Sequence, residues 1–271
     1  MKREGIMKLL IVSADPRLTL GYSKVIQQIA NYLATKEVEI VMYTLNFREN
    51  SVLPCTYIDP RIKLLPVPDS QSYGFDKFRS VVDKECPDYV FIYGPTNVIY
   101  NYISLLDKST KVCVYLDICQ KWSELHTLQK LKNRVTHWFT FLKCWSDHLV
   151  NDLKIDSERV SVVEHGVNFS EFEPVDTKQA KDVMGFGKFL VLNMNRNSIR
   201  KNWAVTISGF VEFISRHEYN PDIQLYVSCG ANKKHSDNHC DIEAHVYTEF
   251  FKRGLEYMNY TKNFIINDHP L

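Results

Sequence analysis

Short, continuous apolar runs alternate along this chain with longer amphipathic ones. The run "KLLIVSA" (8–14) is apolar almost throughout, and the stretch "GYSKVIQQIANYLATK" (21–36) repeats its apolar residues at helical spacing. Strands that are apolar on both sides need covering on both faces, and alternation with helices is typical of parallel sheets. The pattern therefore predicts an α/β fold with Rossmann-like parallel sheets.

The alternation continues through most of the chain. Further strands are expected at 39–45, 62–67, 89–94, 111–118, 137–143 and 160–166, with helices at 75–85 and 97–108. The pattern restarts with strands at 189–195, 223–230 and 263–268 and helices at 202–217 and 242–257. We expect an N-terminal domain at 1–170, a connection at 171–188 that is acidic and broken by Pro174, and the first part of a second domain at 189–271. Three strands predict an incomplete second sheet.

Composition excludes several classes of protein. The formal net charge of the 271 residues is +1, which argues against a general nucleic-acid binder. No apolar run approaches the roughly 20 residues that cross a bilayer. The seven cysteines form no CxxC pair, and Cys113 lies inside an apolar run. This usage indicates a reducing compartment and predicts a cytoplasmic protein.

Ligands of open α/β sheets bind at the carboxyl ends of the strands, and three segments there carry unusual residues. Gly21, Tyr22 and Ser23 follow the first strand and begin a helix, whose free N–H groups suit an anion. An ordinary helix-start glycine is the alternative, and no GxGxxG dinucleotide motif is present. His165 and Gly166 follow a later strand, where the glycine would permit a tight turn; a lone histidine is more often structural.

The third segment, "LVLNMNRNSIRKNWAVTISGF" (190–210), carries three cations between a strand and a helix. These are Arg196, Arg200 and Lys201. Basic side chains beside a helix N-terminus suit a phosphate, although a solvated loop is the alternative.

Together these segments resemble glycosyltransferase family 4, whose enzymes have the GT-B fold of two Rossmann-like domains. The resemblance rests on "LGYSKVIQQIANYL", "VVEHGVNFSEFEP" and "NRNSIRKNWAVTISGFVEF", in that order. It implies an acceptor-binding first domain and a nucleotide-sugar-binding second domain. It also implies retention of configuration without a metal or other cofactor. The family's diphosphate clamp is similar to Arg196 and Lys201 here, with Arg200 less certain.

Two departures from the family pattern stand out. Many relatives carry a histidine where this chain has Leu116, so Asp117 is the expected substitute, orienting the acceptor or the transferred sugar. Asp117 as a helix cap is the alternative. The family's E-x7-E carboxylates have no counterpart upstream of Leu271, so we expect a chain truncated within the donor domain. This leaves open whether the chain is active alone.

Three remaining features have competing explanations. Five potential metal ligands lie close together in sequence: Cys229, His235, His239, Cys240 and His245. The segment around them is rich in glycine and asparagine, which predicts a loop, so no metal is expected. Trp122 is a candidate for acceptor stacking. The run "KLKNR" (130–134) predicts either a solvated helix face or a weak peripheral membrane contact.

The sequence thus predicts an enzyme that transfers a hexose from a UDP- or GDP-sugar to a glycan, lipid or protein-linked acceptor. Two alternatives remain. One is a nucleotide-sugar epimerase of the same architecture, and the other is a non-catalytic carbohydrate-binding module.

Overall fold

The computed structural model describes residues 5–18, 20–47, 57–68, 73–117, 124–169, 172–195, 197–229 and 240–267. The chain divides into two compact units, Met1–Val167 and Asn168–Leu271, each with its own parallel sheet. The predicted α/β fold with two parallel sheets is therefore confirmed. Among the described helices, none combines the length and the apolar character needed to cross a bilayer.

The first unit contains a seven-stranded sheet and five α-helices within the described residues. Its strands are β1 (Met7–Ala14), β2 (Val38–Phe47), β3 (Lys63–Pro68), β4 (Tyr89–Gly94), β5 (Val112–Leu116), β6 (His137–Thr140) and β7 (Val160–Val162). Its helices are α1 (Gly21–Ala34), α2 (Phe75–Glu85), α3 (Thr96–Ser104), α4 (Leu125–Leu131) and α5 (Lys143–Asn151), with a 3-10 turn η3 (Ser157–Arg159).

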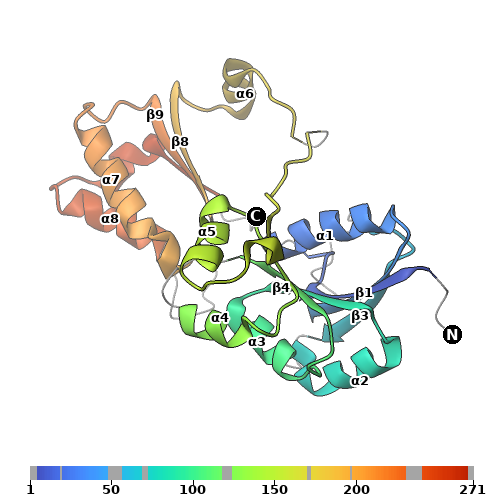
Figure 1. Ribbon diagram of the computed structural model, residues 1–271. Coiled ribbons are helices and arrows are strands. Elements are labelled where there is room, and N and C mark those ends of the chain that lie inside the picture. Colours follow the sequence, from blue (N-terminus) through green and yellow to red (C-terminus); the bar gives the residue numbers. More distant parts are fainter. Residues whose placement is uncertain are drawn as a thin grey trace. The chain divides into compact units, whose positions relative to one another are not determined.

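The strand order β3-β2-β1-β4-β5-β6-β7 fixes which helices cover which face. Crossovers between parallel strands are right-handed almost without exception. The chain steps one way from β1 to β2 and the other way from β4 to β7, so α1 covers one face and α2 and α3 the other (Figure 1). The direction reverses between β1 and β4, which is where ligands bind in sheets of this type.

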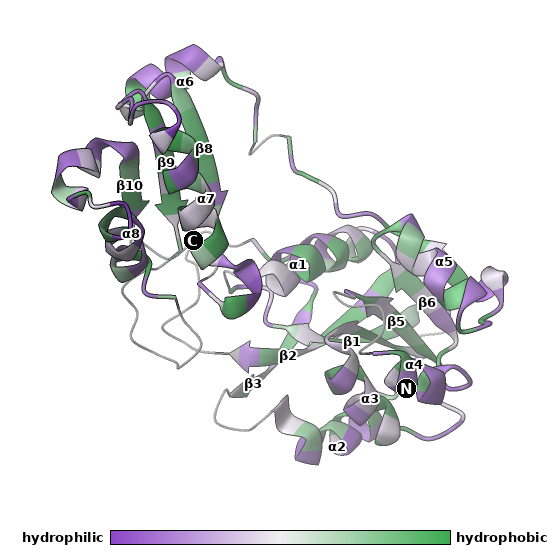
Figure 2. Ribbon diagram, turned by 90° about the vertical axis from the view of Figure 1, so that its left-hand side faces the viewer, coloured by the Kyte–Doolittle hydropathy of each residue, from purple (hydrophilic) through white to green (hydrophobic). Residues whose placement is uncertain are grey.

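Both faces of the first sheet are buried, which explains the continuous apolar runs. Leu10 and Val12 of β1 belong to the core under α2, α3, α4 and α5, whereas Leu9 and Ile11 belong to the core under α1. Figure 2 shows the resulting hydrophobic strands, in contrast to the mixed colouring of the helices around them.

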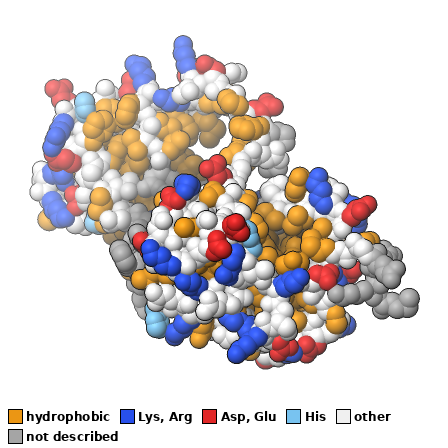
Figure 3. Space-filling model, in the orientation of Figure 1, with side chains coloured by type: hydrophobic (Ala, Val, Ile, Leu, Met, Phe, Trp, Pro, Cys, Tyr) orange, Lys and Arg blue, Asp and Glu red, His pale blue; other side chains and the backbone are white. Residues whose placement is uncertain are grey.

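The second unit has the sheet order β10-β9-β8, again all parallel. Its elements are α6 (Thr177–Met184), β8 (Phe189–Met194), η4 (Ile199–Lys201), α7 (Trp203–Ser215), β9 (Ile223–Ser228), α8 (Ile242–Phe251), η5 (Tyr257–Asn263) and β10 (Phe264–Asn267). Both crossovers step the same way, so α7 and α8 share one core over one face. Leu192 and Met194 of β8 stay exposed, and apolar side chains gather over β8 and β9 in Figure 3.

Several predicted elements were too long, and the helices α5 and α6 were missed. The helix expected over 242–257 ends at Phe251, because the chain turns at Gly254 with a left-handed φ of 67°. The expected connection at 171–188 contains α6, which Asp176 caps through the backbone N–H of Gln179.

The tripeptide Asp-Pro-Arg occurs twice and builds the same turn each time. After β1, the Asp15 carboxylate accepts hydrogen bonds from the backbone N–H of Arg17 at 3.0 Å and from its guanidinium at 2.8 Å. Asp59 and Arg61 repeat this arrangement before β3. Both aspartates are buried, but the turns differ in the exposure of the arginine, which is 25% for Arg17 and 63% for Arg61, and only Asp15 also accepts the Thr44 hydroxyl.

This difference gives a prediction for stability. Asp15→Ala removes an acceptor shared by Arg17 and Thr44, and we expect the free energy of unfolding to fall by about 3 kcal/mol, because breaking a buried ion pair costs about 3–5 kcal/mol. Asp59→Ala is the matched control and should cost clearly less, since water replaces the lost partner of Arg61. Urea denaturation followed by circular dichroism measures both, and equal losses would show that the lower exposure of Arg17 and the hydrogen bond from Thr44 contribute nothing.

A network of ion pairs links the end of α8 to α7. The buried Glu249 carboxylate pairs with Lys252 at 2.7 Å and with Arg253 at 3.0 Å, and Arg253 also reaches Glu212 of α7 at 3.1 Å. The hydrogen bond from Lys252 is the largest cause that lowers the pKa of Glu249, to about 2.

The lowered pKa of Glu249 predicts an acid-labile second unit. Because the folded-state pKa lies below the unfolded value of about 4.3, the carboxylate stabilises the fold above that pH and loses its contribution as pH falls towards about 2. Glu249→Gln should therefore flatten the dependence of stability on pH between about 4.5 and 2, measured by urea denaturation at several pH values. An unchanged pH dependence in the variant would contradict the assignment.

Candidate functional site

The start of α1 lies at the carboxyl end of β1 and lacks the usual cap. Leu20 precedes the helix in an extended conformation, no described side chain caps it, and no acidic residue lies in the first turn. A Cβ on Gly21 would meet no atom of the described residues within 4 Å, so these residues leave the position open. The Ser23 hydroxyl is buried without a hydrogen-bond partner among the described residues. Free helical N–H groups and an unsatisfied hydroxyl suit an oxygen-rich ligand.

Five aromatic rings run from this helix start along the carboxyl edge of the first sheet. We call Tyr22, Tyr93, Tyr115, His165 and Phe141 the aromatic row. The ring centroids of Tyr22 and Tyr93 are 4.9 Å apart, and those of Tyr93 and Tyr115 are also 4.9 Å apart, in a stacked arrangement. His165 meets Tyr115 edge-on at 5.8 Å and stacks on Phe141 at 4.9 Å. The row connects two predicted site segments, at Tyr22 and at His165.

Asp117 directly follows β5 and is half-buried next to the row. Burial is the largest cause that raises the pKa of Tyr115, to about 12, and the negative charge of Asp117 adds to it. The same two causes raise the pKa of Tyr93. Both phenols are therefore neutral hydrogen-bonding groups at neutral pH, and Asp117 is the nearby charge. The alternative role of Asp117 as a helix cap involves residues outside the described ones, as does the acceptor-stacking role of Trp122.

His165 lies near the end of the first unit, in the segment that leads to the second unit, and contacts within the first unit fix its position. The Tyr115 hydroxyl donates a hydrogen bond to the carbonyl of Val163, two residues before His165. The imidazole is exposed apart from its two ring neighbours. The φ of Gly166 lies outside the left-handed region, and the turn of this segment comes two residues later, where the Phe172 N–H donates to the Asn168 carbonyl at 3.1 Å. The structure thus brings Tyr22, Asp117 and His165 to one sheet edge.

The second group of predicted residues lies at the carboxyl end of β8. Arg200 and Lys201 end the short turn η4, after which Asn202 adopts a left-handed φ of 51° and α7 begins at Trp203. Arg196 lies outside the described residues. Arg200 is exposed and Lys201 half-buried, and no described acid pairs with either. By contrast, other cations of this unit are paired: Lys188 with Asp222, Arg216 with Glu212 and Lys252 with Glu249.

Asn197 fixes the course of this basic loop. Its buried amide donates to the Cys240 carbonyl at 2.8 Å and accepts from the Cys240 N–H at 3.0 Å. Two reciprocal hydrogen bonds tie the loop after β8 to the start of the α8 segment. Sequence reasoning missed this residue, because its partner lies 43 positions away.

Two other features have simpler roles. His235 and His239 lie outside the described residues, and no described cluster of His, Cys, Asp or Glu has the geometry to hold a metal ion. In the basic run 130–134, the Arg134 guanidinium donates to the carbonyls of Leu106 and Asp107, and the Lys130 ammonium lies over the Tyr100 ring. Part of this run therefore has a structural role, and the membrane contact stays a prediction.

Comparisons with known proteins identify the fold. No protein-family model matches the chain, and no curated protein matches it in sequence. A solved glycosyltransferase from Rickettsia africae ESF-5 is 14% identical over 97% of this chain and 68% of its own, with a TM-score of 0.60.

Two further structures hold UDP. The UDP complex of MnaA from S. aureus is 16% identical over 98% of this chain and 69% of its own, with a TM-score of 0.62. The UDP-GlcNAc 2-epimerase from Methanocaldococcus jannaschii, in complex with UDP-GlcNAc and UDP, is 12% identical over 98% of this chain and 74% of its own, with a TM-score of 0.55. The chain therefore has the GT-B type of architecture that glycosyltransferases and UDP-GlcNAc 2-epimerases share.

Proposed function

We propose that this chain binds a UDP- or GDP-linked sugar and transfers the hexose to a hydroxyl acceptor with retention of configuration, as enzymes of glycosyltransferase family 4 do. The acceptor would be a glycan, a lipid or a protein-linked sugar. The observation that carries the proposal is the pair of cations Arg200 and Lys201, unpaired with any described acid, at the carboxyl end of β8.

The chemistry of the reaction explains the need for these cations. Breaking the bond between a sugar and a phosphate places negative charge on the departing nucleotide diphosphate. Fixed positive groups stabilise that charge in the transition state. Lys201, Arg200 and Arg196 would bind the diphosphate together with the N–H groups at the start of α7. No metal or other cofactor is part of this proposal.

The first unit would hold the acceptor. The uncapped start of α1 with Ser23 offers hydrogen bonds to hydroxyl or phosphate oxygens. Asp117 would orient the acceptor or the transferred sugar by accepting hydrogen bonds from its hydroxyls. His165, fixed by Tyr115 and Phe141, offers a further donor or acceptor beside the reacting sugar.

Epimerisation of a nucleotide-sugar is the second candidate. It is favoured by the fold shared with UDP-GlcNAc 2-epimerases and would use the same diphosphate site. The products distinguish the two, because an epimerase converts the nucleotide-sugar without any acceptor. A carbohydrate-binding module without catalysis, the third possibility, would bind glycans and no nucleotide-sugar.

The diphosphate site gives the first functional prediction. Calorimetric titration with UDP, GDP and their common sugars should show binding that Lys201→Ala and Arg196→Ala each weaken by roughly ten- to a hundredfold, because a charge-assisted hydrogen bond contributes about 1.5–3 kcal/mol. Arg200→Ala should weaken it less, since this side chain is more exposed.

Lys188→Ala is the matched control, because Lys188 precedes the same strand at its opposite end and already pairs with Asp222 at 3.0 Å. Its affinity should equal that of the unaltered chain. If neither Arg196→Ala nor Lys201→Ala changed the nucleotide affinity, these cations would belong to a solvated loop and not to a diphosphate site.

Asp117 gives the second functional prediction. Asp117→Asn keeps the shape but replaces one acceptor oxygen with an NH2 donor, which misorients the substrate hydroxyls, so turnover of the bound nucleotide-sugar should fall by about a hundredfold while nucleotide affinity stays unchanged. Chromatography of the products from a panel of acceptors measures turnover, with Asp83→Asn on α2 as the control. A variant with full turnover would exclude Asp117 from the reaction.

A further inference from the structure

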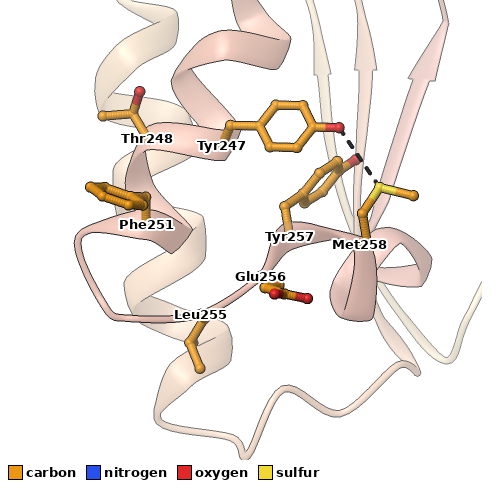
Figure 4. A pocket seen from close by; sticks show the side chains of 7 residues that line it. All are labelled: Tyr247, Thr248, Phe251, Leu255, Glu256, Tyr257 and Met258. Atoms are coloured by element: carbon orange, nitrogen blue, oxygen red, sulfur yellow. Dashed lines mark hydrogen bonds between the residues drawn. The ribbon is translucent and has the colours of Figure 1, made fainter.

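A shallow groove lies on the second unit between the end of α8 and the turn η5. Its volume is about 480 Å³, and seven residues line it: Tyr247, Thr248, Phe251, Leu255, Glu256, Tyr257 and Met258. Figure 4 shows Tyr247, Tyr257 and Met258 gathered on one side and Phe251 on the other. Because α8 runs opposite to the strands, its end lies at the amino edge of the sheet. The groove is thus at the opposite edge from Arg200 and Lys201.

One wall of the groove is rigid. The Tyr257 ring packs edge-on against Tyr247 at 4.7 Å and against the core residue Phe264 at 5.9 Å, and it lies tilted against Phe250 at 5.7 Å. The Tyr247 hydroxyl donates to the Met258 sulfur at 3.7 Å, drawn as a dashed line in Figure 4. A preorganised aromatic wall loses little conformational entropy when a ligand binds.

The apolar side chains around this wall are not needed for the core. Helix α8 buries Val246 and Phe250, whereas Phe251 is 82% exposed, Met258 66% and Tyr247 48%. Phenylalanine, tyrosine and methionine are enriched where proteins bind one another. Contiguous exposed side chains of this kind mark interaction sites.

The groove also carries uncompensated negative charge. Glu256 is exposed at its rim, and no described cation pairs with its carboxylate. The nearest cations in sequence, Lys252 and Arg253, are bound to Glu249. Glu243, one turn before Tyr247 on α8, adds a second negative charge that acts on Tyr257. A neutral glycan or an anionic lipid surface would leave this charge unbalanced.

We infer that this groove docks a segment of a partner protein that presents an apolar side chain next to a lysine or arginine. The apolar side chain would pack between Phe251 and Tyr257. The cation would pair with Glu256 and lie against the ring faces, which attract positive charge. This interaction is independent of the proposed sugar transfer, because it uses the other edge of the sheet.

Selection from a phage-displayed library of random dodecapeptides tests the inference. The whole chain is the target, and a Phe251→Ala, Glu256→Gln double variant serves for counterselection. We expect the enriched peptides to carry Lys or Arg within three positions of a large apolar residue. A synthetic copy of one such peptide, titrated by calorimetry, should lose about tenfold in affinity with Glu256→Gln and with Phe251→Ala.

The conservative variants Glu256→Asp and Phe251→Tyr should retain most of the affinity, which separates recognition from a general loss of structure. Sedimentation velocity tests whether the occupant is a second copy of this chain. Enriched peptides without basic residues, peptides that bind the double variant equally well, no enrichment at all, or self-association abolished by Phe251→Ala would each overturn the inference.

Discussion

The parallel direction of every strand is the constraint on which the rest of this structure depends. Neighbouring parallel strands can be joined only by a crossover, and right-handed crossovers decide which face each helix covers. In the first unit this rule separates α1 from α2 and α3, and the reversal of direction leaves the ends of β1 and β4 side by side. All carboxyl ends then lie at one edge, where Tyr22, Asp117 and His165 collect.

The aromatic row shows how such an edge becomes a rigid surface. Tyr93 and Tyr115 occupy paired positions on β4 and β5, so their rings stack as the strands pair. Tyr115 then holds the segment after β7 through its hydroxyl and through the His165 ring. A chain segment without regular structure thereby gains a fixed position from two ordinary strands, which is what a catalytic or binding side chain requires.

The two edges of the second sheet differ in charge and in chemistry. At the carboxyl edge, no described acidic side chain pairs with Arg200 or Lys201, and Asn197 fixes the loop that carries them. At the amino edge, no described cation pairs with the Glu256 carboxylate, which lies among exposed aromatic rings. A net charge close to zero conceals this separation, because the formal charge of +1 averages over both edges. One edge suits an anion and the other a cation with an apolar neighbour.

Apolar periodicity is a local property of the chain that burial on two faces demands, so the strands, most helices and the existence of two parallel sheets could be predicted from the sequence. The segments at the carboxyl ends of strands, including Gly21 to Ser23, His165 and the basic loop, could be located in the same way. Which side chains meet could not be predicted. The stacking of Tyr93 on Tyr115, the pairing of Asn197 with Cys240 and the burial of Asp15 all depend on strand register and on contacts between distant residues. The end of α8 at Phe251 was missed for a related reason: helical periodicity continued past the left-handed Gly254, and the groove beside it arises only when η5 packs against the helix.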